Sequence, residues 1–331
     1  MKVIKPSIDI MRTGLESEPL QPEQFIEKVG RTCYKSEDKI TPDSADKFVK
    51  GLIVRGHEAM LEHWNFIFKT DAKWYEQIVT DWEMLQHNLN TPGIKHPRLY
   101  LRFTDFQYHG EMRCIVSGNV RAWRDYAKAC IDGFGFIPLY MYGLIKSHPL
   151  LFPEFKDWVP IAVINDILVP IEVSELTRSE RQVHQDITVK FICDRGVSHE
   201  IVRHRIASFA QESTRYCNYG QDKFGKGITV IAPSWCEEGG VVWMDWKLSC
   251  YRAESDYFTL LNRGTVPQEA RSVLPNSLKT EVIMTGNLDC WDHFFELRCA
   301  PDAHPDIQVV AKMVRSELAN ELILERGFLE D

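Results

Sequence analysis

The 331-residue sequence lacks the features that mark several specialised classes of protein. Its most apolar stretch, residues 134–145, is about twelve residues long and contains Pro138, so it is too short to cross a bilayer. The opening residues, MKVIKPSIDIMRTG, have no apolar core of the kind found in signal peptides. The nine cysteines are odd in number and form no Cys-X-X-Cys pair. We therefore expect reduced thiols in a cytoplasmic protein and not a disulfide scaffold.

An excess of positive charge is also missing. The chain has 39 Lys and Arg against 47 Asp and Glu, which gives a net charge of −8. This acidity argues against a dedicated binder of duplex DNA or of an anionic membrane, but it permits a small anionic ligand in a local basic pocket. With 44% hydrophobic and 26% charged residues, the chain is predicted to be a soluble globular protein of the α/β or α+β class.

Three common ligand-binding motifs are incomplete or absent. GQDKFGKG, residues 220–227, is similar to a nucleotide phosphate loop, but Gly227 stands where Ser or Thr must bind magnesium. His199 and His204 are five positions apart, which on a helix separates them by about 140°, so they cannot share a metal ion. The sequence contains no Gly-X-Gly-X-X-Gly fingerprint of a dinucleotide fold. No metal site is predicted.

Regular patterns predict helices and strands in three segments. A helix is expected from Thr41, as its N-cap, to a stop at Gly56, followed by a strand over 66–68. A strand over 187–192 leads into a helix that Ser198 is expected to cap, with Ile201 and Val202 turned inward. Further elements are predicted as a strand over 228–233, a short helix over 267–275, a strand over 278–287, a helix over 288–298, and helical stripes over 74–85 and 120–127.

Arginines are concentrated in RHRIASFAQESTRY, residues 203–216. Arg203, Arg205 and Arg215 lie there among hydroxyl and amide side chains. A guanidinium group matches phosphate geometry, and hydroxyls and amides supply further donors, so the segment predicts an anion site. The alternative is a solvated basic helix face that pairs with nearby acids.

Two more arginines, Arg271 and Arg298, lie in apolar surroundings. Asn287 and Arg298 are eleven positions apart, so on a helix they share a face to within about 20° and stand roughly 16 Å apart along the axis. They could bracket an elongated pocket. The alternative, which the residues alone favour, is that Arg298 neutralises the carboxyl end of its helix.

Taken together, these segments resemble the flavin-dependent thymidylate synthase family. RHRIASFAQES fits the family signature of Arg-His-Arg, seven residues and Ser, which Ser213 closes. GRTCYKS, GHEAMLEH, SHEIVRHR, STRYCNY and EARSVLPNSLKTE also resemble family blocks, in the same order. The similarity covers most of residues 28–68 and 187–312. It implies one domain over residues 1–331 with an insertion at about 69–186, and a mixed α/β (α+β) fold with a central, mainly antiparallel sheet and flanking helices.

The resemblance implies an enzyme with several ligands. Family members bind FAD, reduce it with NADPH, and transfer a methylene group from 5,10-methylenetetrahydrofolate to C5 of dUMP, giving dTMP and tetrahydrofolate. They assemble as homotetramers with active sites shared between subunits, and no nucleic acid or membrane partner is expected. Two alternatives stay open: an enzyme of the same scaffold that adds methyl or hydroxymethyl to a pyrimidine nucleotide, and a non-catalytic nucleotide- or folate-binding protein.

Matching the family motifs residue by residue assigns two groups of side chains. The implied FAD contacts are Cys33, His57, Arg203, His204, Arg205, Asn287 and His293. The implied dUMP contacts are Glu200, Gln211, Ser213, Arg215, Arg271 and Arg298. Three positions depart from the pattern of some members, which have Gln in place of Glu200, Asn in place of His293 and Arg in place of Asp289.

The chemistry of dUMP methylation suggests roles for four of these residues. Charge develops on the uracil oxygens when C5 acts as a nucleophile, and Arg298 is our candidate to stabilise it. Arg215 and Arg271 are expected to hold the phosphate and fix the pyrimidine in place. Ser213 has no obvious general base beside it, so we assign it hydrogen bonding and no covalent step.

Cys217 is the rival nucleophile, because positive charge lowers the pKa of a thiol. If dUMP activation is non-covalent, Cys217→Ala retains most dTMP formation, whereas Arg298→Ala loses nearly all of it with FAD still bound. Product mass and visible flavin absorbance measure the two outcomes. An inactive Cys217→Ala variant that still binds FAD would contradict the non-covalent interpretation.

Overall fold

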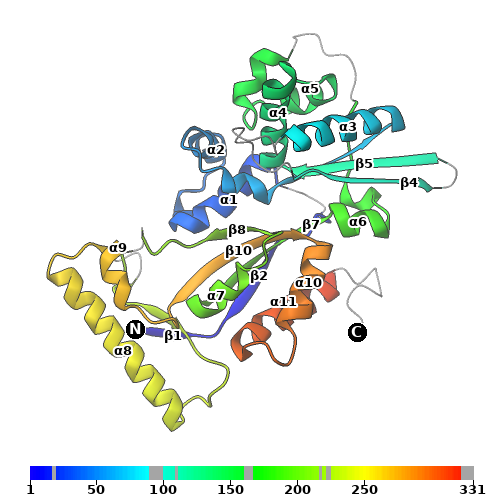
Figure 1. Cartoon of the computed structure of the whole chain (residues 1–331). Helices are drawn as coiled ribbons and strands as arrows, with labels where there is room; N and C mark the ends of the chain where they lie inside the picture. Colours follow the sequence, from blue (N-terminus) through cyan, green and yellow to red (C-terminus); the bar gives the residue numbers. More distant parts are fainter. Residues whose placement is uncertain are drawn as a thin grey trace. The chain divides into compact units, whose positions relative to one another are not determined.

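The computed structural model describes residues 1–16, 20–88, 100–108, 111–159, 167–215, 218–220 and 225–321. The chain forms two compact units (Figure 1). Unit 1 comprises residues 1–12, 29–38 and 187–331, and unit 2 comprises residues 13–28 and 39–186. The residues expected to form an insertion, 69–186, lie within unit 2. That they are inserted into one larger domain stays a prediction.

Unit 1 is built on a four-stranded sheet with the order β2-β7-β10-β8. β2 (Ser7–Arg12) pairs antiparallel with β7 (Asp186–Asp194), and β8 (Ser208–Gln211) pairs antiparallel with β10 (Lys279–Asn287). The other elements of unit 1 are the parallel pair β1 (Lys2–Ile4) and β9 (Thr229–Ile231), and the helices α7 (Arg195–Ile201), α8 (Val241–Asn262), α9 (Pro267–Ala270), α10 (Leu288–Arg298) and α11 (Pro305–Glu321).

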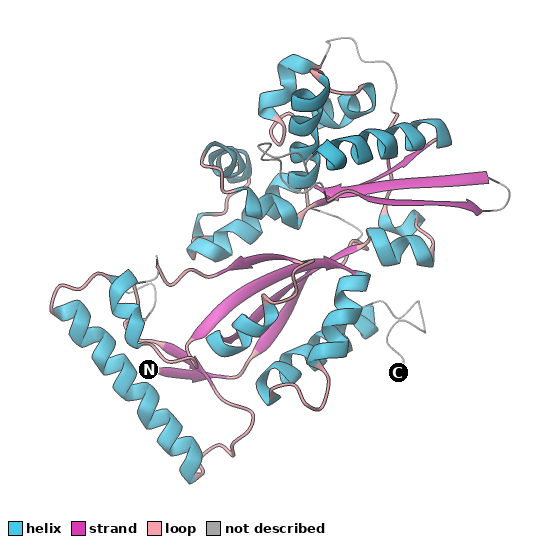
Figure 2. Cartoon of the chain, viewed as in Figure 1, coloured by secondary structure: helices cyan, strands magenta, loops and turns pink. Residues whose placement is uncertain are grey.

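The core of unit 1 lies between one face of this sheet and three helices. Because side chains alternate along a strand, Ile187, Val189 and Phe191 of β7 point to the same side. They pack in one buried cluster with apolar residues of α7, α10 and α11. Figure 2 shows these three helices along the same face of the sheet. The short helix α7 is therefore held by the core and not by its own length, since seven residues are too few for a stable isolated helix.

The opposite face of the sheet carries a buried ionic cluster at β8 and β10. Lys279 pairs with Glu281 and lies 2.9 Å from Glu212, and Lys35 also pairs with Glu281. Glu212 and Glu281 are only 3% and 7% exposed. Burial alone would raise the pKa of Glu281, but Lys279 and Lys35 outweigh it and hold that pKa below its usual value. The cluster therefore joins the end of α1 (Pro22–Tyr34) to the sheet through ion pairs, in which each buried carboxylate has a lysine partner.

Unit 2 has its own four-stranded sheet with the order β4-β5-β3-β6. β3 (Asn65–Thr70) pairs antiparallel with β5 (Glu111–Asn119), which pairs antiparallel with β4 (Arg102–Tyr108). The remaining elements of unit 2 are β6 (Val169–Pro170), α2 (Ser44–Val54), α3 (Ala72–Asn88), α4 (Val120–Phe134), α5 (Tyr142–Ser147), α6 (Arg178–His184) and short 3-10 turns at Glu58–His63, Leu139–Met141, Pro153–Trp158 and Val173–Glu175.

The predicted fold class, a mixture of helices with mainly antiparallel sheets, is confirmed. The helix expected from Thr41 is α2, and it begins at Ser44. The Thr41 backbone N–H donates to Ser44 Oγ, and the Ser44 hydroxyl donates to the Thr41 carbonyl, so residues 41–44 form a turn before the helix. The prediction for Val202 was also wrong, since the helix ends at Ile201 and leaves Val202 exposed. Among the described residues, no helix is both long and apolar enough to span a membrane.

We predict that Lys279→Met destabilises unit 1 by about 3–5 kcal/mol, because it leaves the buried carboxylates of Glu212 and Glu281 without their main partner. Urea unfolding measures the change. Lys5→Met is the matched control, since Lys5 is exposed and such a surface change alters stability by no more than about 0.5 kcal/mol. Equal stability of the two variants would show that the cluster contributes nothing.

Candidate functional site

Helix α7 is the element around which the candidate site is built. It starts directly after β7, where the Asp194 side chain accepts a hydrogen bond of 2.6 Å from the Val197 backbone N–H and so caps the helix. Ser198, which the sequence suggested as the cap, lies inside the helix, is fully buried, and donates from its hydroxyl to the Arg195 carbonyl at 2.8 Å. The true cap precedes the expected one by four residues, and this places Arg195 in the first turn.

Arg298, the last residue of α10, binds the carboxyl end of α7. Its guanidinium donates to Glu200 Oε2 at 2.8 Å, to the Glu200 carbonyl at 3.1 Å and to His204 Nε2 at 3.0 Å. Three bonds in different directions fix the plane of the guanidinium group. Arg298 therefore does more than neutralise the end of its own helix.

His204 is a neutral imidazole in this arrangement. Burial first, and then the positive charges of Arg298 and His293, lower the pKa of His204 to about 4. Its Nε2 accepts the bond from Arg298, so its proton is on Nδ1 at neutral pH. The His293 ring lies 5.9 Å away, and the His293 side chain is 59% exposed. The fixed positive charge of the Arg-His-Arg segment therefore comes from its arginines and not from its histidine.

A cavity of about 540 Å³ lies at the other end of α7, and we call it the Arg195–Arg271 cavity. Arg271 donates to Thr214 Oγ1 at 2.8 Å, and the cavity is lined by Arg195, Thr214, Gln268, Glu269, Arg271, Ser272, Leu274, Pro275, Asn276 and Leu278. The Arg195 side chain makes no hydrogen bond or ion pair with the described residues. Sequence reasoning missed Arg195, although its position immediately after a buried strand was a usable signal.

The predicted residues between these two ends lie against α7 and the sheet. Gln211 donates from Nε2 to Ser198 Oγ at 3.0 Å and to Thr280 Oγ1 at 3.3 Å. The Ser213 backbone N–H donates to the Cys33 carbonyl at 3.2 Å. Burial raises the pKa of the Cys33 thiol to about 12, so this cysteine is protonated and inert at neutral pH.

Helix α7 separates the backbone of Arg195, at one end of the site, from that of Glu200, at the other. From Arg195 to Glu200, which holds Arg298, the helix rises about 7.5 Å. This separation is comparable with that between the phosphate and the base of a mononucleotide. The structure therefore brings one pair of predicted dUMP residues, Glu200 and Arg298, into contact, and places Arg271 at the opposite end of the same helix.

Arg203 and Arg205 fit an anionic cofactor. Both are exposed on either side of the buried His204, and neither makes a hydrogen bond or ion pair with any described residue. Two uncompensated guanidinium groups two residues apart are a suitable donor set for a diphosphate such as that of FAD.

The structure gives the positions of the other residues predicted to contact FAD or dUMP, and their roles stay predictions. The Asn287 side-chain oxygen caps α10 by accepting from the Cys290 N–H at 3.1 Å. Arg215 is exposed beside Thr214, and His57 belongs to unit 2. Cys217 lies outside the described residues.

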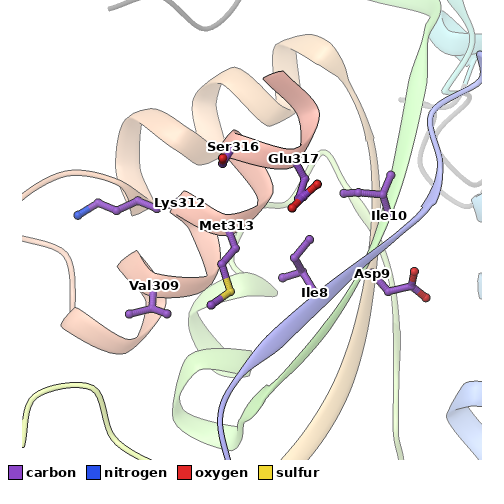
Figure 3. A pocket seen from close by; sticks show the side chains of 8 residues that line it. All are labelled: Ile8, Asp9, Ile10, Val309, Lys312, Met313, Ser316 and Glu317. Carbon is purple, nitrogen blue, oxygen red and sulfur yellow. The ribbon is translucent and has the colours of Figure 1, made fainter. Parts of the chain in front are cut away.

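A larger cavity in unit 1, of about 720 Å³, contains none of the predicted residues (Figure 3). It lies between β2 and α11, where Ile8 and Ile10 point toward the helix while Asp9 points to the other side of the strand. Its other lining residues are Val309, Lys312, Met313, Ser316 and Glu317. Its one cation, Lys312, is bonded to Gln308, so it offers no anion site comparable with the Arg195–Arg271 cavity.

Comparison with known proteins matches the part of the chain that carries this site. Residues 180–322 match the family described as "Thymidylate synthase complementing protein", Thy1. The flavin-dependent thymidylate synthase of Pyrococcus furiosus is 35% identical over 127 residues, which are 38% of this chain and 51% of that protein. The enzyme of the same name from Geobacter sulfurreducens is 37% identical over 117 residues, 35% of this chain and 49% of that protein. That from Sulfolobus acidocaldarius is 36% identical over 166 residues, 50% of this chain and 57% of that protein.

The chain spans about half the length of the curated relatives it matches. A solved structure titled as a UMP/dUMP methylase, PolB from Streptomyces cacaoi bound with 5-Br UMP, is 24% identical over 43% of this chain and 71% of that one, with a TM-score of 0.36. A likeness at that score supports no conclusion about this chain. The sequence matches, in contrast, are consistent and cover α7, β8, β10 and α10. Residues 180–322 are therefore similar to the thymidylate synthase complementing protein (Thy1) family, and the relatives matched here are named flavin-dependent thymidylate synthases.

Proposed function

We propose that the protein methylates dUMP at C5 with a bound flavin, using 5,10-methylenetetrahydrofolate as the carbon donor and giving dTMP. The observation that carries the proposal is the pair of guanidinium positions at the two ends of α7. At one end, the guanidinium groups of Arg195 and Arg271 line a cavity. At the other end, Glu200 and His204 hold the guanidinium of Arg298. A phosphate at one end and a pyrimidine at the other match this spacing.

The Arg195–Arg271 cavity is the proposed site of the dUMP phosphate. Arg195 has no charged partner among the described residues, and the Thr214 hydroxyl that binds Arg271 can donate to a phosphate oxygen. Ser213 and Arg215 are next to Thr214 along the chain, so we propose that they add further donors. Binding the phosphate there fixes the nucleotide and lowers the entropic part of the barrier.

Arg298 is the proposed catalytic residue at the base. As C5 of the uracil forms its bond to the incoming carbon, negative charge develops on the ring oxygens, and a guanidinium already held in place stabilises it without reorganisation. Glu200 is the positioning residue, because it accepts two of the three bonds that orient Arg298. This role accounts for a carboxylate at a position where some family members have Gln. His204, being neutral, accepts from Arg298 without competing for the substrate's charge.

No covalent attack by the described residues is needed in this proposal. Among the residues that the structure describes, no general base is in hydrogen-bond contact with the Ser213 hydroxyl, and Cys33 is protonated because burial raises its pKa to about 12. Gln211, fixed by Ser198 and Thr280, presents its amide at the middle of α7 and is a proposed contact of the nucleotide.

The flavin is proposed to be FAD, reduced by NADPH. Arg203 and Arg205 are the residues that would hold its phosphates, and His57, His204, Asn287, His293 and Cys33 are the further proposed contacts. When bound, FAD would supply the reducing equivalents that complete the methyl group. We also propose a homotetramer, as the family resemblance implies. The exposed Arg203 and Arg205, which do not line the Arg195–Arg271 cavity, would then be available to a ligand shared with a neighbouring copy.

The test is a complete reaction with purified protein, dUMP, 5,10-methylenetetrahydrofolate, NADPH and FAD, with the product identified by mass. We expect dTMP and the visible absorbance of a bound flavin. A hydroxymethylated nucleotide would instead assign the protein to a different reaction on the same scaffold. A flavin-free protein that binds dUMP without turnover would assign it to the non-catalytic alternative.

We predict that Arg298→Lys lowers kcat for dTMP formation by about 10²- to 10³-fold while flavin absorbance is retained, because an ammonium cannot make the planar, multidentate contacts of a guanidinium. Steady-state kinetics and absorbance spectra measure both properties. Arg252→Lys on α8 is the control, since Arg252 is exposed and forms no hydrogen bond or ion pair with the described residues. Unchanged kcat in Arg298→Lys would exclude Arg298 as the catalytic residue.

We predict that Arg195→Ala and Arg271→Ala each weaken dUMP binding by about 10- to 100-fold, the effect of losing one hydrogen bond to a charged group. Deoxyuridine, which has no phosphate, should bind the variants and the unaltered protein equally. Calorimetric titration with the two ligands makes the comparison. If both ligands lose affinity in parallel, the cavity does not hold the phosphate.

A further inference from the structure

Unit 2 contains a second, chemically distinct cavity, which we call the aromatic cavity. It has a volume of about 310 Å³, near the lower end of the range for small-molecule sites. α3 and the segment after α4 form its walls, with the lining residues Trp74, Gln77, Asp81, Met84, Phe134, Phe136, Pro138, Leu139 and Tyr140. None of these residues belongs to the site proposed above.

The rings of the aromatic cavity are arranged at angles to one another. Trp74 and Tyr140 lie 6.3 Å apart with 65° between their planes, and Phe134 and Phe136 lie 5.9 Å apart with 31° between theirs. Neither pair is parallel, so neither offers two facing planes between which a flat heterocycle could stack, whereas a compact cation is attracted by any ring face within about 6 Å of its centre. The tilted rings are therefore compatible with a compact cation.

Asp81 gives the aromatic cavity one fixed carboxylate. Gln77 donates to its Oδ1 at 2.8 Å and Tyr140 donates to its Oδ2 at 2.7 Å. Both donors are neutral, and no Lys, Arg or His among the described residues forms an ion pair with Asp81. Each carboxylate oxygen keeps a further lone pair. The negative charge of Asp81 is thus oriented by the protein but not neutralised by it.

A buried hydrogen-bond chain holds Asp81 and Tyr140 in place. Tyr126 and Tyr140 join their hydroxyls at 2.6 Å, and both side chains are almost fully buried. Burial raises the pKa of each phenol, so Tyr140 stays a donor to Asp81 over the whole neutral range. A carboxylate supported in this way is preorganised for a ligand.

The mouth of the aromatic cavity is apolar and open. Met84, Phe136 and Leu139 are 51%, 56% and 44% exposed, so large apolar groups face solvent beside the carboxylate. One of the walls already attracts a cation, since the Lys73 ammonium lies 5.6 Å from the centre of the Trp74 ring. Aromatic faces and an uncompensated carboxylate at one opening are complementary to a group that is both apolar and positively charged.

We propose that the aromatic cavity binds a small free organic cation, an alkylated ammonium ion, with its charge against Asp81 and its alkyl groups against Trp74, Phe136 and Tyr140. The proposal rests on unit 2 alone, so it stands or falls independently of the dUMP reaction.

The first experiment compares choline with 3,3-dimethyl-1-butanol, a neutral molecule of the same shape in which carbon replaces the ammonium nitrogen. Saturation-transfer NMR on the full chain reads the methyl protons of either ligand. We expect choline to bind at least about 10-fold more tightly, because only the cation gains from the ring faces and the carboxylate. Equal binding of the two, or no transfer to choline, would overturn the proposal.

Variants then locate the binding. We expect Asp81→Asn to weaken choline binding by about 10-fold or more, and Phe136→Ala, at a position that is 56% exposed, by about 3- to 10-fold. Glu83→Gln is the matched control, since it removes the same charge from the same helix outside the cavity and should change affinity by less than about 2-fold. Unchanged affinity in Phe136→Ala would contradict the site even if Asp81→Asn fails to fold.

A last arm distinguishes a free ligand from a protein side chain. We expect Nε-trimethyl-lysine amide to bind no better than choline, because the Asp81 carboxylate and the aromatic rings would contact the trimethylammonium group that the two ligands share. A preference of about 10-fold or more for the lysine derivative would overturn the assignment to a free small molecule.

Discussion

The contact between Arg298 and the carboxyl end of α7 is the interaction on which the candidate site depends. It joins the last residue of α10 to Glu200 and His204, and thereby fixes two segments that are about a hundred positions apart in the sequence. A guanidinium of low exposure is stable there because a carboxylate and a carbonyl accept from it and the neighbouring imidazole is uncharged. Arg298 binds only the carboxyl end of α7, so Arg195, at the start of the helix, belongs to the opposite end of the site.

The arginines of the two units are used in different ways. In unit 2, the buried Arg124 is paired with Glu58 and Glu154, and Arg102 is paired with Asp186 at 2.7 Å, so both are structural. In unit 1, Arg195, Arg203 and Arg205 have no charged partner among the described residues. An exposed guanidinium without an acidic partner costs little stability because water solvates it, and its donors stay available to an anionic ligand.

The ionic cluster on the other face of the sheet holds the segment that follows β8 in place. Glu212 lies between Gln211 and Ser213, so its bond to Lys279 fixes the segment that carries both of these proposed nucleotide contacts. Lys35 reaches the cluster from a left-handed backbone conformation with φ of 48°, which few residues other than glycine adopt. Strain of this kind persists where the surrounding contacts require the side chain.

Unit 2 has its own hydrogen-bond chain, from Tyr126 through Tyr140 to Asp81, and this chain holds the carboxylate of the aromatic cavity in place.

The sequence by itself determined the main helices and strands around the site and the resemblance to a known family. Alternation along residues 187–192 predicted β7, and strand character at the centre of residues 278–287 predicted β10. The concentration of arginines in residues 203–216 predicted an anion site that contains Arg203 and Arg205. These features are local, so spacing alone reveals them. The tertiary structure decided the rest: that Asp194 and not Ser198 caps α7, that His204 is neutral, that Glu200 orients Arg298, and that Arg195 joins Arg271. A hydrogen-bond partner, a degree of burial and a pKa depend on side chains far apart in the sequence, and only the folded chain brings those side chains together.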